Sequence, residues 1–377
     1  MAQNETSTLK KAEQMVASRQ YASAYRLLDE YDPSNDNIAV LLKKEEIVLK
    51  YFAQSMMHRF FSLKDLNDGE TLQSVRQGFE TGDMFSFDVD SLIRRLLVSH
   101  SGDCRLLSGY ACFCEALLND YDEEIWSASF DAGLMRQAAS EKCNSASACY
   151  QMGLYHDYER RPDSAATFYR RATKLCDTMW HAFYNLGIAE GFRLSMTTQG
   201  VDDLHKALHG YTAPVFKADA ARVLGILYDE SIHNTDSAAK YYNMAVEIDG
   251  NSYTNRVILA AFFASHDNPK TYNAINNAWK TAWDADYSMD DFYTMLVTVS
   301  ERAGNSKAVC DFLKQKLNKS DDVYEQGLCC LFLGKFVEDG SSAVNYLRDA
   351  IIHFRQVDAP EAFIEALQEE IDERSGR

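Results

Sequence analysis

Residues 146–172 read ASACYQMGLYHDYERRPDSAATFYRRA, and two features of this stretch decide the fold. A small residue, Gly153, lies in the first half, where it would let a neighbouring helix approach closely. Ala165 and Tyr169 lie in the second half, four residues apart and therefore on one face of a helix. The small Ala165 leaves space on that face, and the large Tyr169 fills space there. The stretch predicts two antiparallel helices in close contact.

The same order of residues recurs twice downstream, around Gly187 and Gly225. Each of these glycines follows a leucine directly, and the second is followed by Ala238 and Tyr242, again four residues apart. The three glycines stand 34 and then 38 residues apart. Because each helix pair leaves an apolar face that only the next pair can cover, this spacing predicts a stacked array.

The pattern resembles that of the tetratricopeptide-repeat (TPR) family, whose unit is a helix-turn-helix of ~34 residues with Leu-Gly on the first helix and Ala-x3-Phe on the second. The match is most regular over residues 146–249 and extends with weaker matches over 101–358. The resemblance implies an all-α fold. It would be a right-handed α-solenoid of paired antiparallel helices, a TPR-like superhelix, with a C-terminal capping helix.

The helical pattern divides the chain into four parts. They are an N-terminal helical segment (1–61), an irregular or helical connector (62–100), the TPR-like repeat array (101–358), and the capping helix with a tail (359–377). Gly69, Gly78 and Gly82 interrupt the periodicity of the connector, and no run rich in Val or Ile predicts a strand. Whether residues 1–100 continue the solenoid or form a separate bundle stays open.

The 377-residue chain carries 56 acidic and 38 basic side chains, a formal charge of −18. Such a charge repels nucleic acid unless a local basic patch overrides it, and we find none. Nine cysteines, an odd number, are scattered through helical tracts, which argues against secretion. The longest nearly apolar run, residues 257–264, is much shorter than the ~20 residues of a membrane helix. These features predict a soluble protein of the reducing cytoplasm.

Two clusters contain residue types that bind metals. His205 and His209 lie four residues apart on a predicted helix, but no third strong ligand accompanies them, so we favour a solvent-facing helix end. Cys112 and Cys114 lie near Cys104, yet residues two apart on a helix point to different faces, which favours small, buried, apolar roles. The sequence contains no phosphate-binding, dinucleotide-binding or catalytic motif. We therefore expect no enzyme activity, no cofactor and no metal.

In a solenoid of this kind the first helices line the concave side, so residues at fixed steps from the repeat glycines are expected to face a groove. These candidate partner-binding residues are Tyr150, Asp157, His181, Tyr184, Asp219, Arg222, Asp229 and Tyr293. Tyrosines supply contact area and carboxylates supply charge-assisted hydrogen bonds, so the groove is expected to bind a basic or amphipathic segment of another protein or peptide. The alternative is that the tyrosines pack between repeats and the acids only solubilise the surface.

These expectations together predict a protein-protein interaction scaffold or adaptor. Some TPR proteins clamp the acidic tail of chaperones with Lys and Asn residues, but Tyr150, Leu154 and Asp219 stand at those places here. The alternative function is a peptide-sensing regulator that changes curvature on binding a short peptide. Residues 1–100 contain no helix-turn-helix motif to support that alternative.

Overall fold

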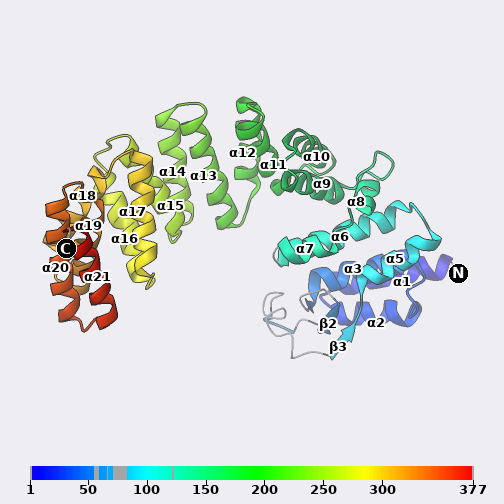
Figure 1. Ribbon diagram of the computed structural model, residues 1–377. Coiled ribbons are helices and arrows are strands. Elements are labelled where there is room, and N and C mark those ends of the chain that lie inside the picture. Colours follow the sequence, from blue (N-terminus) through cyan, green and yellow to red (C-terminus); the bar gives the residue numbers. More distant parts are fainter. Residues whose placement is uncertain (1, 55–58, 66, 71–82, 121–122, 376–377) are drawn as a thin grey trace. The chain divides into compact units, whose positions relative to one another are not determined.

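The computed structural model of the chain describes residues 2–54, 59–65, 67–70, 83–120 and 123–375 (Figure 1). Helices dominate, and they fall into two compact units, Met1–Asp203 and Leu204–Arg377. Each unit has its own apolar core, built from the side chains of neighbouring helices. The predicted all-α fold of paired helices is therefore confirmed within each unit.

Helices that follow one another in the first unit pack together, as α1 does with α2 and α9 with α10. The helices of this unit are α1 (Ala2–Ala17), α2 (Tyr21–Tyr31), α3 (Ile38–Tyr51), α5 (Val89–Ser99), α6 (Cys104–Asp120), α7 (Glu123–Ser129), α8 (Ala132–Ala138), α9 (Ala146–Tyr158), α10 (Pro162–Leu175), α11 (Trp180–Ile188) and the π-helix η2 (Ala189–Arg193). Helix α12 (Thr197–Gly210) contains the boundary between the units. The side chains of Asp131 and Ser145 accept hydrogen bonds from the first backbone N–H groups of α8 and α9, which fixes where these helices begin.

A small antiparallel sheet lies between α3 and α5 in the sequence. Its strands are β1 (Ala53–Gln54), β2 (Phe60–Leu63) and β3 (Asp83–Ser86), in the order β1-β2-β3. The expectation that the chain has no strand is wrong here, because the three strands are short, and β2 and β3 contain phenylalanine instead of a Val or Ile run. The rings of Tyr25 and Phe61 lie 4.5 and 6.0 Å from the ring of Phe85, so the sheet packs on α2. Gly78 and Gly82 lie outside the described residues.

The second unit consists of helices alone in its described part. They are α13 (Pro214–Glu230), α14 (Thr235–Ile248), α15 (Tyr253–Ser265), α16 (Thr271–Asp284), α17 (Met289–Ala303), α18 (Lys307–Lys319), α19 (Val323–Phe336), α20 (Gly340–Gln356) and α21 (Glu361–Arg374). Gly304 ends α17 with a φ of 69°, a left-handed conformation that glycine adopts without strain. Helix α21 packs against α20 and buries Ile364, Leu367 and Ile371, which confirms the predicted capping helix.

Trp279 of α16 anchors the core of the second unit. Its side chain is fully buried, and its indole N–H donates a 2.8 Å hydrogen bond to Glu325 of α19. The Nζ atom of Lys316 on α18 lies 2.9 Å from the same carboxylate oxygen. One buried carboxylate with both partners in place therefore links three helices.

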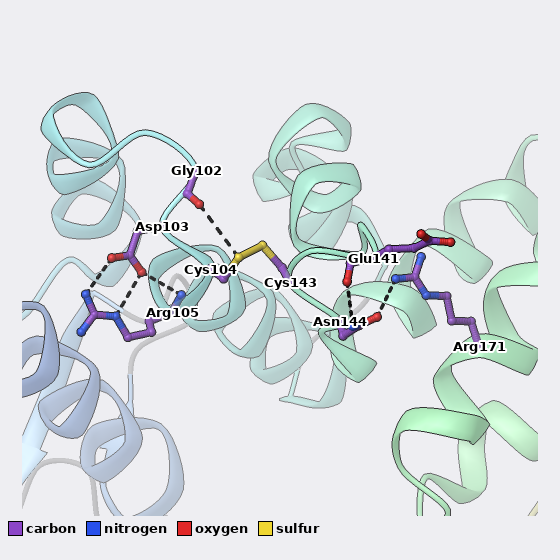
Figure 2. The surroundings of a disulfide bond; sticks show 8 residues. All are labelled: Gly102, Asp103, Cys104, Arg105, Glu141, Cys143, Asn144 and Arg171. Carbon is purple, nitrogen blue, oxygen red and sulfur yellow. Dashed lines mark hydrogen bonds and ion pairs between the residues drawn. A yellow bond between two sulfur atoms is a disulfide. The ribbon is translucent and has the colours of Figure 1, made fainter.

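A disulfide joins Cys104, the first residue of α6, to Cys143, in the turn before α9 (Figure 2). The expected role of Cys104 as a free, buried side chain is wrong, because the spacing of cysteines in a sequence does not reveal which of them meet in the fold. Disulfides persist mainly in oxidising compartments, so the cytoplasmic location stays a prediction. Among the helices of the described ranges, none is both long and apolar enough to cross a membrane.

Candidate protein-binding sites

In two helix pairs the small residue of the first helix lies against the tyrosine of the second helix. A Cβ atom added to Gly153 of α9 would lie 2.3 Å from Cε1 of Tyr169 on α10. A Cβ atom added to Gly225 of α13 would lie 2.7 Å from Cδ1 of Tyr242 on α14. Both tyrosines are buried and fill the space that the glycines leave. In this packing the two helix pairs resemble tetratricopeptide repeats.

The TPR-like pair between them is built differently. Gly200 of α12 faces the backbone of Gly187 and Gly191, and a Cβ atom on Gly200 would lie 2.7 Å from Cα of Gly191. Helices α11 and α12 therefore approach each other closely where glycines of both segments meet, and no aromatic ring of the described residues fills the space between them. The π-helix η2 contains Gly191 and lies within this repeat. A turn of π-helix contains more residues than a turn of α-helix, which accounts for part of the 38-residue spacing between Gly187 and Gly225.

The predicted groove aromatics are only partly accessible. Tyr150 of α9 is buried, and its hydroxyl accepts a 3.4 Å hydrogen bond from Asn185. His181 and Tyr184 of α11 are half-buried, and burial lowers the pKa of His181. In the second unit, Tyr293 of α17 is 38 % exposed, and its ring rests on aromatic side chains of α19. Tyr150 therefore contributes mainly to packing, whereas the other three retain accessible surface.

The predicted groove carboxylates all pair with arginines of the same chain. The pairs are Asp157 with Arg193, Asp219 with Arg222, and Asp229 with Arg302. Asp157 also accepts a 2.8 Å hydrogen bond from the hydroxyl of Tyr169. Because an internal cation balances each charge, these carboxylates attract a basic partner less strongly than the sequence predicts.

Arg302 links two TPR-like pairs of the second unit, because its guanidinium on α17 pairs with Asp229 and Glu230 at the end of α13. We expect Arg302→Met to lower the free energy of unfolding of this unit by about 1 kcal/mol. The nearly buried Asp229 loses its counter-ion, while solvent screens part of that loss. Urea denaturation of the full chain measures the change. Lys307→Met, at an exposed position of α18, is the control, and an equal effect of both substitutions would contradict the prediction.

His205 and His209, the two histidines four residues apart, both form hydrogen bonds within the chain. Nε2 of His205 lies 3.1 Å from the hydroxyl of Tyr241, and Nδ1 of His209 lies 2.6 Å from the backbone oxygen of His205. Cys104 is no longer a free thiol, since it is bonded to Cys143. In the described part of the chain, no three His, Cys, Asp or Glu side chains lie together as a metal site.

An aromatic cavity of about 220 Å³ lies in the second unit, between the ends of α16, α17 and α19. Its wall consists mainly of aromatic and apolar side chains, together with one carboxylate from the turn after α16. The lining residues are Trp283, Asp286, Tyr287, Met289, Phe292, Tyr324 and Leu328. Tyr287 and Tyr324 are each 40 % exposed, so an incoming group can reach their rings.

Asp286 supplies the negative charge of the aromatic cavity. Burial raises the pKa of Tyr324, and the nearby Asp286 carboxylate adds to this effect. Asp286 has a φ of 55°, and its N–H donates a 3.1 Å hydrogen bond to the backbone oxygen of Trp283, which holds the turn. Its carboxylate forms no ion pair with any residue in the described ranges. The aromatic cavity therefore combines open rings with an unbalanced negative charge.

A second, larger cavity of about 920 Å³ lies in the first unit between α3 and α6, and the disulfide borders it. The sequence analysis did not predict either cavity. A signal was present on α3, where Glu45 interrupts an apolar stripe formed by Leu42 and Leu49 at helical spacing. An acidic residue within such a stripe indicates either an internal partner or a binding site.

No family model matches the sequence, and no curated protein matches it. Among solved structures, the chain is similar to YrrB, a TPR protein with an unusual peptide-binding site, at a TM-score of 0.32 and 17 % identity over 59 % of this chain and 92 % of that one. It is similar to MamA at a TM-score of 0.37 and 18 % identity, over 53 % and 96 %. It is also similar to the TPR domain of P58(IPK) at 0.31 and 10 %, over 98 % of each chain. The assignment of the repeats rests on the glycine and tyrosine packing described above.

Proposed function

We propose that this protein is a non-catalytic interaction scaffold that binds a basic or amphipathic segment of another protein. The observation that carries this proposal is the aromatic cavity, in which Asp286 lies beside two exposed tyrosine rings and the half-buried ring of Trp283. The TPR-like repeats support it, because stacked helix pairs expose extended surfaces that suit protein partners.

The aromatic cavity suits one long cationic side chain. Its volume of about 220 Å³ is below the ~300–1,000 Å³ of pockets that enclose small molecules. An ammonium or guanidinium group over the face of a tryptophan or tyrosine ring gains roughly 0.5–2 kcal/mol. Asp286 adds an opposite charge at the same place. We infer that a lysine or arginine of the partner enters here.

The predicted groove residues belong to this proposal as further contacts. Tyr293, in the same unit as the aromatic cavity, keeps accessible surface and can contact apolar parts of the partner segment, and we propose His181 and Tyr184 as separate contacts in the first unit. The groove carboxylates have arginine partners within the chain, so we assign the main electrostatic attraction to Asp286 instead.

Asp286→Asn is expected to weaken binding of the partner segment about tenfold. Asparagine tolerates the positive φ and keeps the shape of the side chain, so the substitution removes only the charge. Partners are captured from a lysate of the native host and identified by mass spectrometry. The bound segment is then synthesised, and its dissociation constant is measured by fluorescence anisotropy. Exchanging its lysine for norleucine, or its arginine for citrulline, should weaken binding to the wild type and hardly affect binding to Asp286→Asn.

Tyr158→Ala is the matched control, since Tyr158 is 78 % exposed and belongs to the first unit. It should leave the dissociation constant within about twofold of the wild type. The aromatic cavity is not the site if Asp286→Asn binds as tightly as the wild type. A partner segment that binds equally well without its lysine or arginine would contradict the proposed chemistry.

A further inference from the structure

The cavity between α3 and α6 has walls that come at helical spacing from both helices. Leu42, Glu45 and Leu49 line it from α3, and Gly109, Cys112 and Ala116 line it from α6. Its volume of about 920 Å³ leaves room for a long side chain together with neighbouring residues of a protein segment. Cys112 is exposed, so the cavity opens to solvent.

Glu45 is a buried acidic group with an unused hydrogen-bonding atom. Its side chain is 3 % exposed, and Oε1 has no hydrogen-bond partner. Gly109 makes room for the carboxyl group, since a Cβ atom there would lie 2.8 Å from Oε2 of Glu45. Lys44, the preceding residue, is equally buried but donates three hydrogen bonds of 2.7–2.8 Å. The fold therefore satisfies the neighbouring buried charge and leaves Glu45 free to accept a donor.

The cations at the rim of this cavity already have acidic partners. Nζ of Lys50 lies 3.1 Å from Glu46 on the same helix, and the guanidinium of Arg105 lies 2.7 Å from Asp103 (Figure 2). Glu45 forms no ion pair with any residue that the structure describes. The titratable group that lacks a partner in the cavity is therefore an acid, and its ionised form complements a cationic ligand.

Burial determines the protonation state of the acidic side chains that line the cavity. Burial raises the pKa of Glu45 to about 8, and the negative charge of Glu46 adds to this. Burial also raises the pKa of Glu115, and a hydrogen bond from Ser147 offsets part of that shift. The other titratable groups that line the cavity are Glu46 and Lys50 on α3, and Arg105 and Cys112 on α6. At neutral pH Glu45 therefore holds a proton, which a cation would displace.

We propose that this cavity binds the long cationic side chain of a protein segment, lysine or arginine, with Glu45 as its counter-ion. The Glu45 side chain turns towards the cavity, so that Oε1, which has no partner in the free protein, accepts the hydrogen bond, and Leu42 and Leu49 receive the aliphatic stem of the ligand side chain. This is a second site, in the other unit and on different residues, so it goes beyond the function proposed above. Either proposal can fail without the other.

Binding of a cation at Glu45 has a defined pH dependence. The positive charge lowers the pKa of Glu45, so the carboxyl group releases its proton to solvent as the complex forms. Affinity then rises with pH by up to about tenfold per unit, and it levels off above the pKa of the free protein. A neutral ligand of the same shape releases no proton, and its affinity stays nearly constant.

Butylguanidinium and its neutral isostere butylurea test the cavity directly. Isothermal titration calorimetry of the full chain is carried out at pH 6.5 and 8.5, in two buffers of different ionisation enthalpy. At pH 8.5 butylguanidinium should bind about tenfold more tightly than butylurea, and the ratio should shrink at pH 6.5. The buffer dependence at pH 6.5 should report release of close to one proton. The peptide acetyl-Leu-Arg-Leu-amide should show the same preference over its citrulline form, and with higher affinity.

Glu45→Gln should abolish the preference for the cation, whereas Glu141→Gln, at an exposed position outside the cavity, should retain it. Because the pKa of Glu45 is raised in the fold, its neutral form stabilises the protein at low pH. That stability is lost as pH rises from about 4.3 towards 8. The melting temperature of Glu45→Gln should therefore match the wild type near pH 4 and exceed it increasingly up to pH 8, which also verifies folding.

Three outcomes would overturn the proposal. Equal affinity for butylguanidinium and butylurea, or binding of neither, would show that the cavity does not select a cation. A preference that persists in Glu45→Gln would exclude Glu45 as the counter-ion. Binding of butylguanidinium without binding of the arginine peptide would indicate a site for small free cations and would exclude a protein segment.

Discussion

Gly153→Val is expected to lower the free energy of unfolding of the first unit by about 3 kcal/mol. A Cβ atom alone would lie 2.3 Å from the ring of Tyr169, and valine adds two methyl groups. The ring has no space to retreat, because Tyr169 is fully buried and its hydroxyl donates a 2.8 Å hydrogen bond to Asp157. Helices α9 and α10 must therefore separate to accommodate the side chain.

Hydrogen exchange with mass spectrometry measures this effect on α9 and α10 separately from the second unit, since stacked repeats can open locally. Gly340→Val is the control, because no atom lies within 4 Å of a Cβ at Gly340, and it should change stability by less than about 0.5 kcal/mol. In a Tyr169→Ala background, Gly153→Val should lose most of its effect. Strictly additive effects of the two substitutions would show that the glycine does not serve to admit the ring.

The repeats could be predicted from the sequence because their packing is local. Gly153 and Tyr169 are 16 residues apart, on helices joined by one short turn. Gly225 and Tyr242 repeat the same arrangement. When two contacting residues are this close along the chain, their spacing nearly determines that they meet. The capping helix after Pro360 was predictable for a similar reason, since proline favours the start of a helix.

The chemistry of the candidate sites could not be predicted in this way, because it depends on distant residues. Asp229 was predicted to face a groove as a free charge, yet its partner Arg302 follows 73 residues later. The aromatic cavity brings Trp283 together with Tyr324, which belongs to a helix three positions further along the chain. These contacts depend on which helices stack and on the rotamers of their side chains. A local sequence pattern reveals neither. The short Phe-rich strands were missed for the same reason, since pairing partners define them.

Replacing both Cys104 and Cys143 by serine is expected to lower the free energy of unfolding of the first unit by up to about 4 kcal/mol. The disulfide closes a loop between cysteines 39 residues apart, and it stabilises the fold chiefly by restricting the unfolded chain. Differential scanning calorimetry of the full chain should show a lower transition temperature for the first unit alone. Adding a reductant to the wild type should produce the same shift, and the double variant should not respond to it. Cys176→Ser, which removes a half-buried free thiol, is the control.

Counting the reactive thiols tests whether the disulfide forms, without a measurement of stability. Nine cysteines are present, and seven of them are free, so unfolding without reductant should expose seven thiols to alkylation. Nine reactive thiols would mean that the bond does not form in solution, and the double variant should then unfold like the wild type. If seven react, the protein matures under oxidising conditions, which would contradict a reducing cytoplasm. Because Cys104 and Cys143 border the cavity between α3 and α6, reduction should then also weaken binding of butylguanidinium, as the start of α6 loses its covalent attachment.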